Sequence, residues 1–304
     1  MSEVKVYIIS LKGSKRLQNI KKRLKQLKIN FEIFYGINGH QKKNHLKLLN
    51  NYDSKKTENY IGRKLAFPEI AAALSHINIY KSIVSNKIKS SIIIEDDAYP
   101  SIDLYKWIKS GNKIKDNSIL SFYSYPSGYL KKSGKKTILK NIKIHQALTH
   151  INNSSCYQIN LKTCETILKI TKGKVCGVGD WPFNIKNNKI ELTVTIPYLV
   201  IMDDYYESYT AAAREKYLSK NYLIESFNKL LIFKILKNLF YILFISFLFK
   251  KKMNYFFYKE IFFDKSIHFF KNLFLNSSLS TYIIFKNKDY YSKDLRLHRF
   301  FKIK

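Results

Sequence analysis

The sequence predicts an α/β protein with a mostly parallel sheet flanked by helices, followed by a basic, aromatic helical appendage. The first observation is a strand–helix–strand order at the amino terminus, which implies parallel strands. The second is Ser91–Ile94, an apolar run that reads as a buried strand and ends in three acids. The third is size, because 304 residues that are 46% hydrophobic can bury a large core.

The amino-terminal unit predicts two strands, Val4–Ile9 and Phe31–Tyr35. Between them, Ser14–Lys28 carries apolar residues at helical spacing, with Ser14 as the expected N-cap. Residues 40–60 are polar and without period, which predicts a loop.

The middle of the chain alternates helices and strands. A helix should begin at Phe67 and run to about Ser85, because Pro68 and Glu69 suit a first helical turn. Segment 112–145 predicts a strand pair with loops. The remaining elements are a strand over Ser155–Ile159, a helix over Leu161–Ile170 and a strand from Glu191 to Val200, ending near Asp203 and Asp204.

Composition changes after about residue 214, which predicts a domain over 1–213 and an appendage over 214–304. The apolar run Leu239–Phe249 is too short to span a bilayer as a helix. Lysines precede it at 234 and 237 and follow it at 250–252. This pattern favours a helix lying on an anionic membrane surface, with an ordinary buried helix as the alternative.

The net charge of +32 comes from 54 basic and 22 acidic residues, and only six of the basic residues are arginine. A lysine-dominated excess of positive charge favours binding to an anionic surface and argues against a specific nucleic-acid reader, which usually relies on arginine.

Three cysteines are too few for a disulfide framework or a zinc site, so we expect a reduced compartment. The first twelve residues lack a signal-peptide pattern, which predicts a cytoplasmic domain.

The acids Glu95, Asp96 and Asp97 are the strongest candidate site. Side chains alternate along a strand, so Glu95 and Asp97 should share one side and Asp96 the other. Two carboxylates on one side can hold Mg²⁺ or Mn²⁺, which in turn can neutralise a diphosphate. The alternative is a solvated acidic turn.

Four stretches together resemble glycosyltransferase family 25, the lipooligosaccharide biosynthesis glycosyltransferases. They are Val6–Leu11 with Arg16, Phe31–Gly39, the helix segment Glu69–His76, and Ile93–Asp97. Ser10 stands where the family often has Asn, and Ala72 takes the position of its usual Cys. The resemblance implies a GT-A-like fold, a nucleotide-sugar donor and transfer with inversion. It makes UDP-galactose the first donor to expect and UDP-glucose the next.

The resemblance also gives roles to residues away from the metal pair. Glu69 and His76 share a helix face and are expected near the donor together with Asp96, although a structural role for His76 is the alternative. Arg16 is expected to contact phosphate or uracil, with a solvated helix position as the alternative.

Inversion needs a base for the acceptor hydroxyl, and Asp180 is the candidate. A helix cap is the alternative for Asp180, and Asp203 and Asp204 are rival bases. Trp181 beside it is expected to form a platform for the acceptor sugar.

The sequence thus predicts a cytoplasmic hexosyltransferase, peripheral on the inner face of the cell membrane. It would use a UDP-sugar and a divalent cation to extend a lipooligosaccharide or other surface glycan. A basic nucleic-acid-binding protein and a catalytically inactive sugar-binding member of the family are the alternatives.

Overall fold

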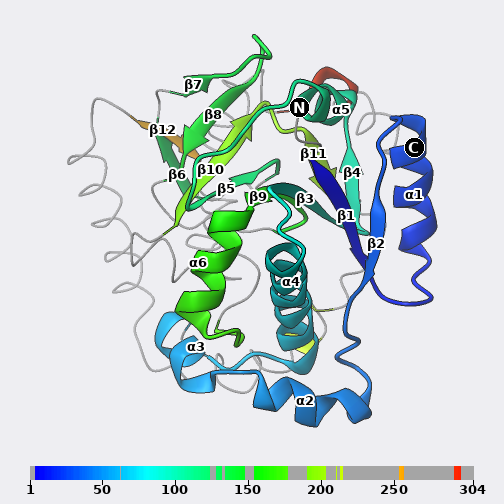
Figure 1. Cartoon of the computed structure of the whole chain (residues 1–304), viewed down its shortest axis with the longest axis vertical. Coiled ribbons are helices and arrows are strands. Elements are labelled where there is room, and N and C mark those ends of the chain that lie inside the picture. Colours follow the sequence, from blue (N-terminus) through cyan, green and yellow to red (C-terminus); the bar gives the residue numbers. More distant parts are fainter. Residues whose placement is uncertain are drawn as a thin grey trace, which may run out of the picture.

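The computed structural model describes residues 4–61, 63–123, 128–131, 134–147, 154–176, 190–202, 210, 213–214, 253–256 and 291–295. Its centre is an eight-stranded sheet in the order β2-β1-β3-β9-β5-β10-β8-β7 (Figure 1). These strands are β1 Lys5–Ser10, β2 Glu32–Tyr35, β3 Ser90–Glu95, β5 Ser118–Ser121, β7 Lys135–Lys136, β8 Lys143–Gln146, β9 Cys156–Asn160 and β10 Glu191–Ile196.

The sheet is mixed, with most strands running in one direction. β1 pairs in parallel with β2 and β3, and β5 pairs in parallel with β10. β9 runs antiparallel between β3 and β5, and β8 is antiparallel to β10 and β7. The predicted α/β class is therefore confirmed, with β8 and β9 as the strands that oppose the common direction.

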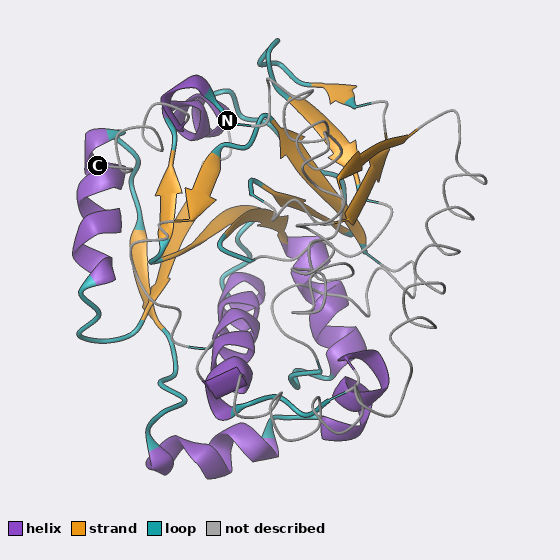
Figure 2. Cartoon of the chain, turned by 180° about the vertical axis from the view of Figure 1, so that it is seen from behind, coloured by secondary structure: helices purple, strands orange, loops and turns teal. Residues whose placement is uncertain are grey.

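Seven helical segments belong to the described chain. They are α1 Arg16–Gln26, the 3-10 turn η1 Lys42–Asn44, α2 His45–Asn50, α3 Ser54–Ile61, α4 Phe67–Ser85, α5 Ile102–Lys109 and α6 Leu161–Thr171. α4 packs beside α6 and α2, and Figures 1 and 2 show α4 and α6 together beneath the sheet while α1 stands apart. Because α4 is covered on several sides, it buries polar side chains as well as apolar ones.

The path of the chain reverses at β1. It leaves β1 through α1 to reach β2 on one side, then returns through α4 to β3 on the other side. Right-handed crossovers in opposite directions place the two connecting helices on opposite faces. The carboxyl ends of β1 and β3 therefore form a topological switch point, where open α/β sheets bind ligands.

Several local predictions were wrong. Residues 40–60, expected as a loop, contain η1, α2 and most of α3. Among their described side chains only Leu48 in α2 and Thr57 in α3 are buried, so these short helices carry no apolar stripe. Ser14 does not cap α1, since Lys15 is the N-cap residue and the Ser14 hydroxyl donates elsewhere. The strand expected over 191–200 is split into β10 and β11 Val200–Met202, and β11 pairs with β4 Ala98–Pro100.

Pieces of the predicted appendage contact the first 213 residues. β12 Met253–Phe256 pairs antiparallel with β6 Gly128–Lys131. Asp294 accepts a hydrogen bond from the backbone N–H of Ile102 at 2.9 Å and forms an ion pair with Arg23 at 3.3 Å. The division at residue 213 stays a prediction, and the expected membrane-surface helix with its flanking lysines lies outside the described residues.

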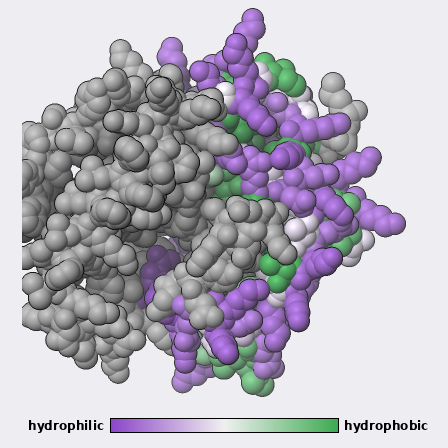
Figure 3. Space-filling model, turned by 90° about the vertical axis from the view of Figure 1, so that its left-hand side faces the viewer, coloured by the Kyte–Doolittle hydropathy of each residue, from purple (hydrophilic) through white to green (hydrophobic). Residues whose placement is uncertain are grey.

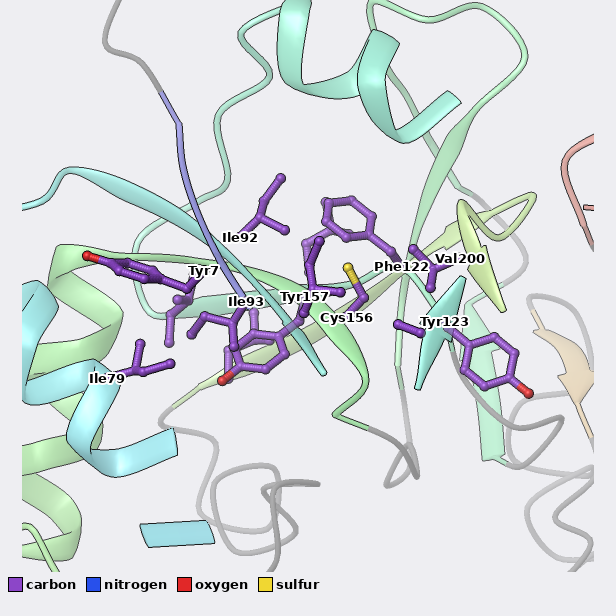
Figure 4. Packing of buried hydrophobic residues seen from close by; sticks show 14 of the residues in the cluster. Tyr7, Ile79, Ile92, Ile93, Phe122, Tyr123, Cys156, Tyr157 and Val200 are labelled. Carbon is purple, nitrogen blue, oxygen red and sulfur yellow. The ribbon is translucent and has the colours of Figure 1, made fainter. Parts of the chain in front are cut away.

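The core is continuous along the sheet, and Figure 4 shows part of it around Ile93, Cys156 and Tyr157. All three cysteines are buried and free, and burial raises their pKa values, which fits core packing.

Hydrophilic side chains cover most of the described surface in Figure 3. No helix among the described residues is long and apolar enough to cross a membrane.

Candidate functional site

The acidic residues Glu95, Asp96 and Asp97 lie at the switch point. β3 ends at Glu95, and Asp96 and Asp97 form the turn into β4. The register pairs Ile9 with Glu95, so the end of β1 runs beside the turn. The strand stops at Glu95, so the alternation of side chains along β3 does not extend to Asp97. Arg16 contacts both Asp96 and Asp97.

Asp96 is held by the first βα connection. Its Oδ2 accepts hydrogen bonds from the hydroxyls of Ser10 and Ser14, both at 2.7 Å. Its Oδ1 lies 3.3 Å from Nε of Arg16. With both oxygens engaged and a side chain only 9% exposed, Asp96 anchors the turn to β1 and α1.

Arg16 ties Asp97 into the same cluster. Its Nη1 donates to Oδ2 of Asp97 at 3.0 Å, and the guanidinium is 7% exposed. Burial and the neighbouring charge on Glu95 raise the pKa of Asp97 to about 7, although Arg16 acts to lower it. Oδ1 of Asp97 is buried and has no hydrogen-bond partner among the described residues.

Glu95 is oriented from the opposite side. Ser154 donates to its Oε1 at 2.6 Å, and Nε2 of His76 lies 3.2 Å from the same oxygen. The antiparallel register places Cys156 beside Ile94, which brings Ser154 to the end of β3. Burial acts to raise the pKa of Glu95, but the contacts with His76 and Ser154 outweigh it and lower the pKa. Oε2 has no hydrogen-bond partner within the described chain.

The residues present fit a hard divalent cation. Oε2 of Glu95 and Oδ1 of Asp97 are carboxylate oxygens without a hydrogen-bond partner in the described chain, and the Glu95 side chain is 30% exposed. No group of three or more His, Cys, Asp or Glu residues is placed to hold a metal within the described ranges. Two carboxylates completed by substrate phosphates and water are the ligand set that Mg²⁺ commonly takes.

Glu69 belongs to a different cluster, although it shares a helix with His76. Its carboxylate accepts two hydrogen bonds from Arg63, at 2.7 and 2.8 Å, and one from Nε of Arg214 at 2.9 Å. It also accepts from the backbone N–H of Ala66 at 2.9 Å. Glu69 thus organises the start of α4, while His76 contacts Glu95 about two turns further along the helix.

Four predicted site residues lie outside the described residues: Asp180, Trp181, Asp203 and Asp204.

The sequence did not predict that Ser10, Ser14 and Ser154 contact the acidic residues. Ser10 directly follows a predicted strand, which is a usable signal, whereas Ser154 depends on strand pairing.

These observations define the class of protein as an α/β protein with an acidic, cation-compatible site at a sheet switch point. The model of glycosyltransferase family 25, described as LPS biosynthesis protein, matches residues 3–179. This match covers more than half of the chain, and the protein therefore belongs to glycosyltransferase family 25. Among curated proteins, the comparison found no match.

Two solved structures are similar at low scores. The mannose-1-phosphate geranyltransferase from Thermus thermophilus has a TM-score of 0.36 at 7% identity, covering 64% of this chain and 73% of its own. The inositol-1-phosphate CTP transferase from T. maritima has a TM-score of 0.33 at 8% identity, covering 72% of this chain and 98% of its own. Scores this low do not establish a shared fold.

Proposed function

We propose that this chain is an inverting hexosyltransferase that uses a UDP-sugar to extend a lipooligosaccharide or other surface glycan. The observation that carries the proposal is the acidic turn, with two carboxylate oxygens that lack hydrogen-bond partners in the described chain, in a member of family 25. The family description, LPS biosynthesis protein, supports the class of acceptor. Galactose is the first donor sugar to test and glucose the second.

Glu95 and Asp97 would hold the cation, Mn²⁺ or Mg²⁺, in this reaction. Such an ion supplies positive charge where the leaving diphosphate becomes more negative. Asp96 would act on the donor indirectly, because Ser10, Ser14 and Arg16 already occupy its oxygens.

Arg16 would serve chiefly to hold the acidic turn in place. Its guanidinium is buried against Asp96 and Asp97, which ties both aspartates to the start of α1. Direct contact between Arg16 and the donor phosphate or uracil stays a prediction. Glu69 would support the donor side by fixing the start of α4, on which His76 stands.

Asp180 would take the proton from the acceptor hydroxyl in a single displacement, and Trp181 would stack against the acceptor sugar. Asp203 and Asp204 are the alternative bases. The lysine-rich appendage would hold the enzyme on the anionic inner face of the cell membrane, in the cytoplasm. The charge of +32 supports attraction to such a surface.

A donor screen tests the proposal. The full chain is incubated with individual UDP-hexoses, with Mn²⁺ or with EDTA, and with a lipooligosaccharide acceptor, and UDP release is measured. We expect release with one hexose, stimulated by acceptor and abolished by EDTA. Binding of a UDP-sugar in a thermal-shift assay without any release would identify an inactive sugar-binding member. Salt-sensitive DNA retention without UDP-sugar binding would favour the nucleic-acid alternative.

A further inference from the structure

A buried chain of hydrogen bonds leads from the core to Glu95. The hydroxyl of Tyr80 lies 2.7 Å from the hydroxyl of Tyr157, which lies 2.7 Å from Nδ1 of His76. Nε2 of His76 then contacts Glu95 at 3.2 Å. Tyr80, Tyr157 and His76 are 2%, 0% and 4% exposed, so water has little access to this chain.

The fold brings these side chains to one face of the sheet. Residues paired across antiparallel strands point the same way, and Tyr157 pairs with Ile93, two residues before Glu95. Figure 4 shows the Tyr157 ring near Ile93. On α4, His76 and Tyr80 are four residues apart and share a helix face, so both meet Tyr157.

The hydrogen bonds can all point toward Glu95. An imidazole that donates from Nε2 to a carboxylate has Nδ1 free to accept when it is neutral. Tyr157 can then donate to Nδ1 and accept from Tyr80. Burial and the neighbouring Tyr80 raise the pKa of Tyr157 well above its ordinary value, so Tyr157 stays a hydroxyl.

We propose that Tyr157 is a positioning residue that fixes the tautomer and ring orientation of His76, and through it the Glu95 carboxylate. The inference rests on the proposed function, because it assigns Glu95 to the cation and donor. His76 and Ser154 both contact Oε1, and this leaves Oε2 without a hydrogen-bond partner within the described residues. Partners behind a metal-binding group typically change activity or metal affinity about 10–100-fold when they are removed.

Turnover provides the first test. Tyr157→Phe keeps the ring and should lower kcat for UDP release by about 10–100-fold, with little change in the donor KM. The matched control is Tyr198→Phe, which also removes a hydroxyl from a buried tyrosine, one that packs edge-on against Tyr123 and Tyr291. In a His76→Gln background, Tyr157→Phe should cause little further loss. Equal losses in Tyr157→Phe and Tyr198→Phe, or additive losses with His76→Gln, would overturn the proposal.

The second test needs no activity. Nitrogen-15 NMR of histidine-labelled protein reports the tautomer of each ring, and the His76 signals are identified by their loss in His76→Gln. We expect a single tautomer with the proton on Nε2, and a mixture in Tyr157→Phe. Unchanged His76 signals in Tyr157→Phe overturn the inference. If Tyr157→Phe does not fold, the wild-type spectrum still decides: a proton on Nδ1 of His76 overturns the inference, because Tyr157 would then accept from the ring instead of donating to it.

The two tests separate the two proposals. A wild-type chain that releases no UDP from any donor refutes the hexosyltransferase, whereas the tautomer measurement still decides the role of Tyr157.

Discussion

Replacing Glu69 by Gln tests how strongly the start of α4 depends on a buried charge. Glu69 is 0% exposed, and its carboxylate joins Arg63, Arg214 and the backbone of Ala66. Gln keeps the shape, but it removes the negative charge and turns one acceptor into a donor that faces guanidinium donors. The two arginines then lose the partner that compensates their partial burial.

Breaking a buried ion pair typically costs about 3–5 kcal/mol. The lower end applies here, because Arg63 and Arg214 are 21% and 41% exposed and can regain contact with water. We therefore expect Glu69→Gln to lower the free energy of unfolding by about 3 kcal/mol. The matched control is Glu32→Gln, which breaks an equally short pair with Lys5, 2.8 Å against 2.7 Å, at the surface. That change should cost at most about 1 kcal/mol.

Urea unfolding followed by circular dichroism compares both variants with the wild type at pH 7. The pH dependence has a definite sign. Burial acts to raise the pKa of Glu69, but Arg63, Ala66 and Arg214 outweigh it and the pKa is lowered from 4.5. Stability from these contacts is therefore present above pH 4.5 and is lost as the pH falls through the lowered value. The difference between Glu69→Gln and wild type should shrink in acid. A loss no larger than that of Glu32→Gln, or one independent of pH, would refute this reasoning.

The proposed reaction and anchor give three further predictions. Asp97→Ala should abolish transfer and weaken Mn²⁺-dependent UDP binding measured by calorimetry, and full activity in this variant would contradict the cation role. Asp180→Asn should bind donor normally but transfer at least ~10²-fold more slowly, whereas early melting with normal specific activity would identify a helix cap. The joint change Lys250→Glu, Lys251→Glu and Lys252→Glu should release the protein from anionic vesicles in a sedimentation assay, since each lysine contributes about 1 kcal/mol there. Continued pelleting would show that another feature binds the lipid.

The sheet core and the position of the acids could be predicted because both are local in the sequence. β1 and β3 are continuous apolar runs, and the acids follow the second run directly. α2 was missed because Leu48 is its single buried residue while Leu46 and Leu49 are exposed, so that the short segment has no buried apolar stripe.

The surroundings of the acids could not be predicted, because they depend on long-range pairing. Tyr157 reaches His76 only because β9 inserts antiparallel between β3 and β5. Arg214 reaches Glu69 from 145 residues away, and no periodicity in either segment signals that contact. Spacing along α4 correctly placed Glu69 and His76 on one helix, but it could not show that they serve separate clusters.

The three carboxylates of the acidic turn have different contacts, and the pKa values of two of them shift in opposite directions. Among the described residues, the guanidinium of Arg16 contacts Asp96 and Asp97, and Asp96 also accepts hydrogen bonds from the hydroxyls of Ser10 and Ser14. The contacts with His76 and Ser154 outweigh burial and lower the pKa of Glu95, whereas burial and the neighbouring charge on Glu95 raise the pKa of Asp97 to about 7. A bound divalent cation would offset this negative charge at Oε2 of Glu95 and Oδ1 of Asp97, which lack hydrogen-bond partners within the described residues. We therefore expect Mn²⁺ or Mg²⁺ to stabilise the folded chain, and to lose that effect in Asp97→Ala while keeping it in Glu32→Gln.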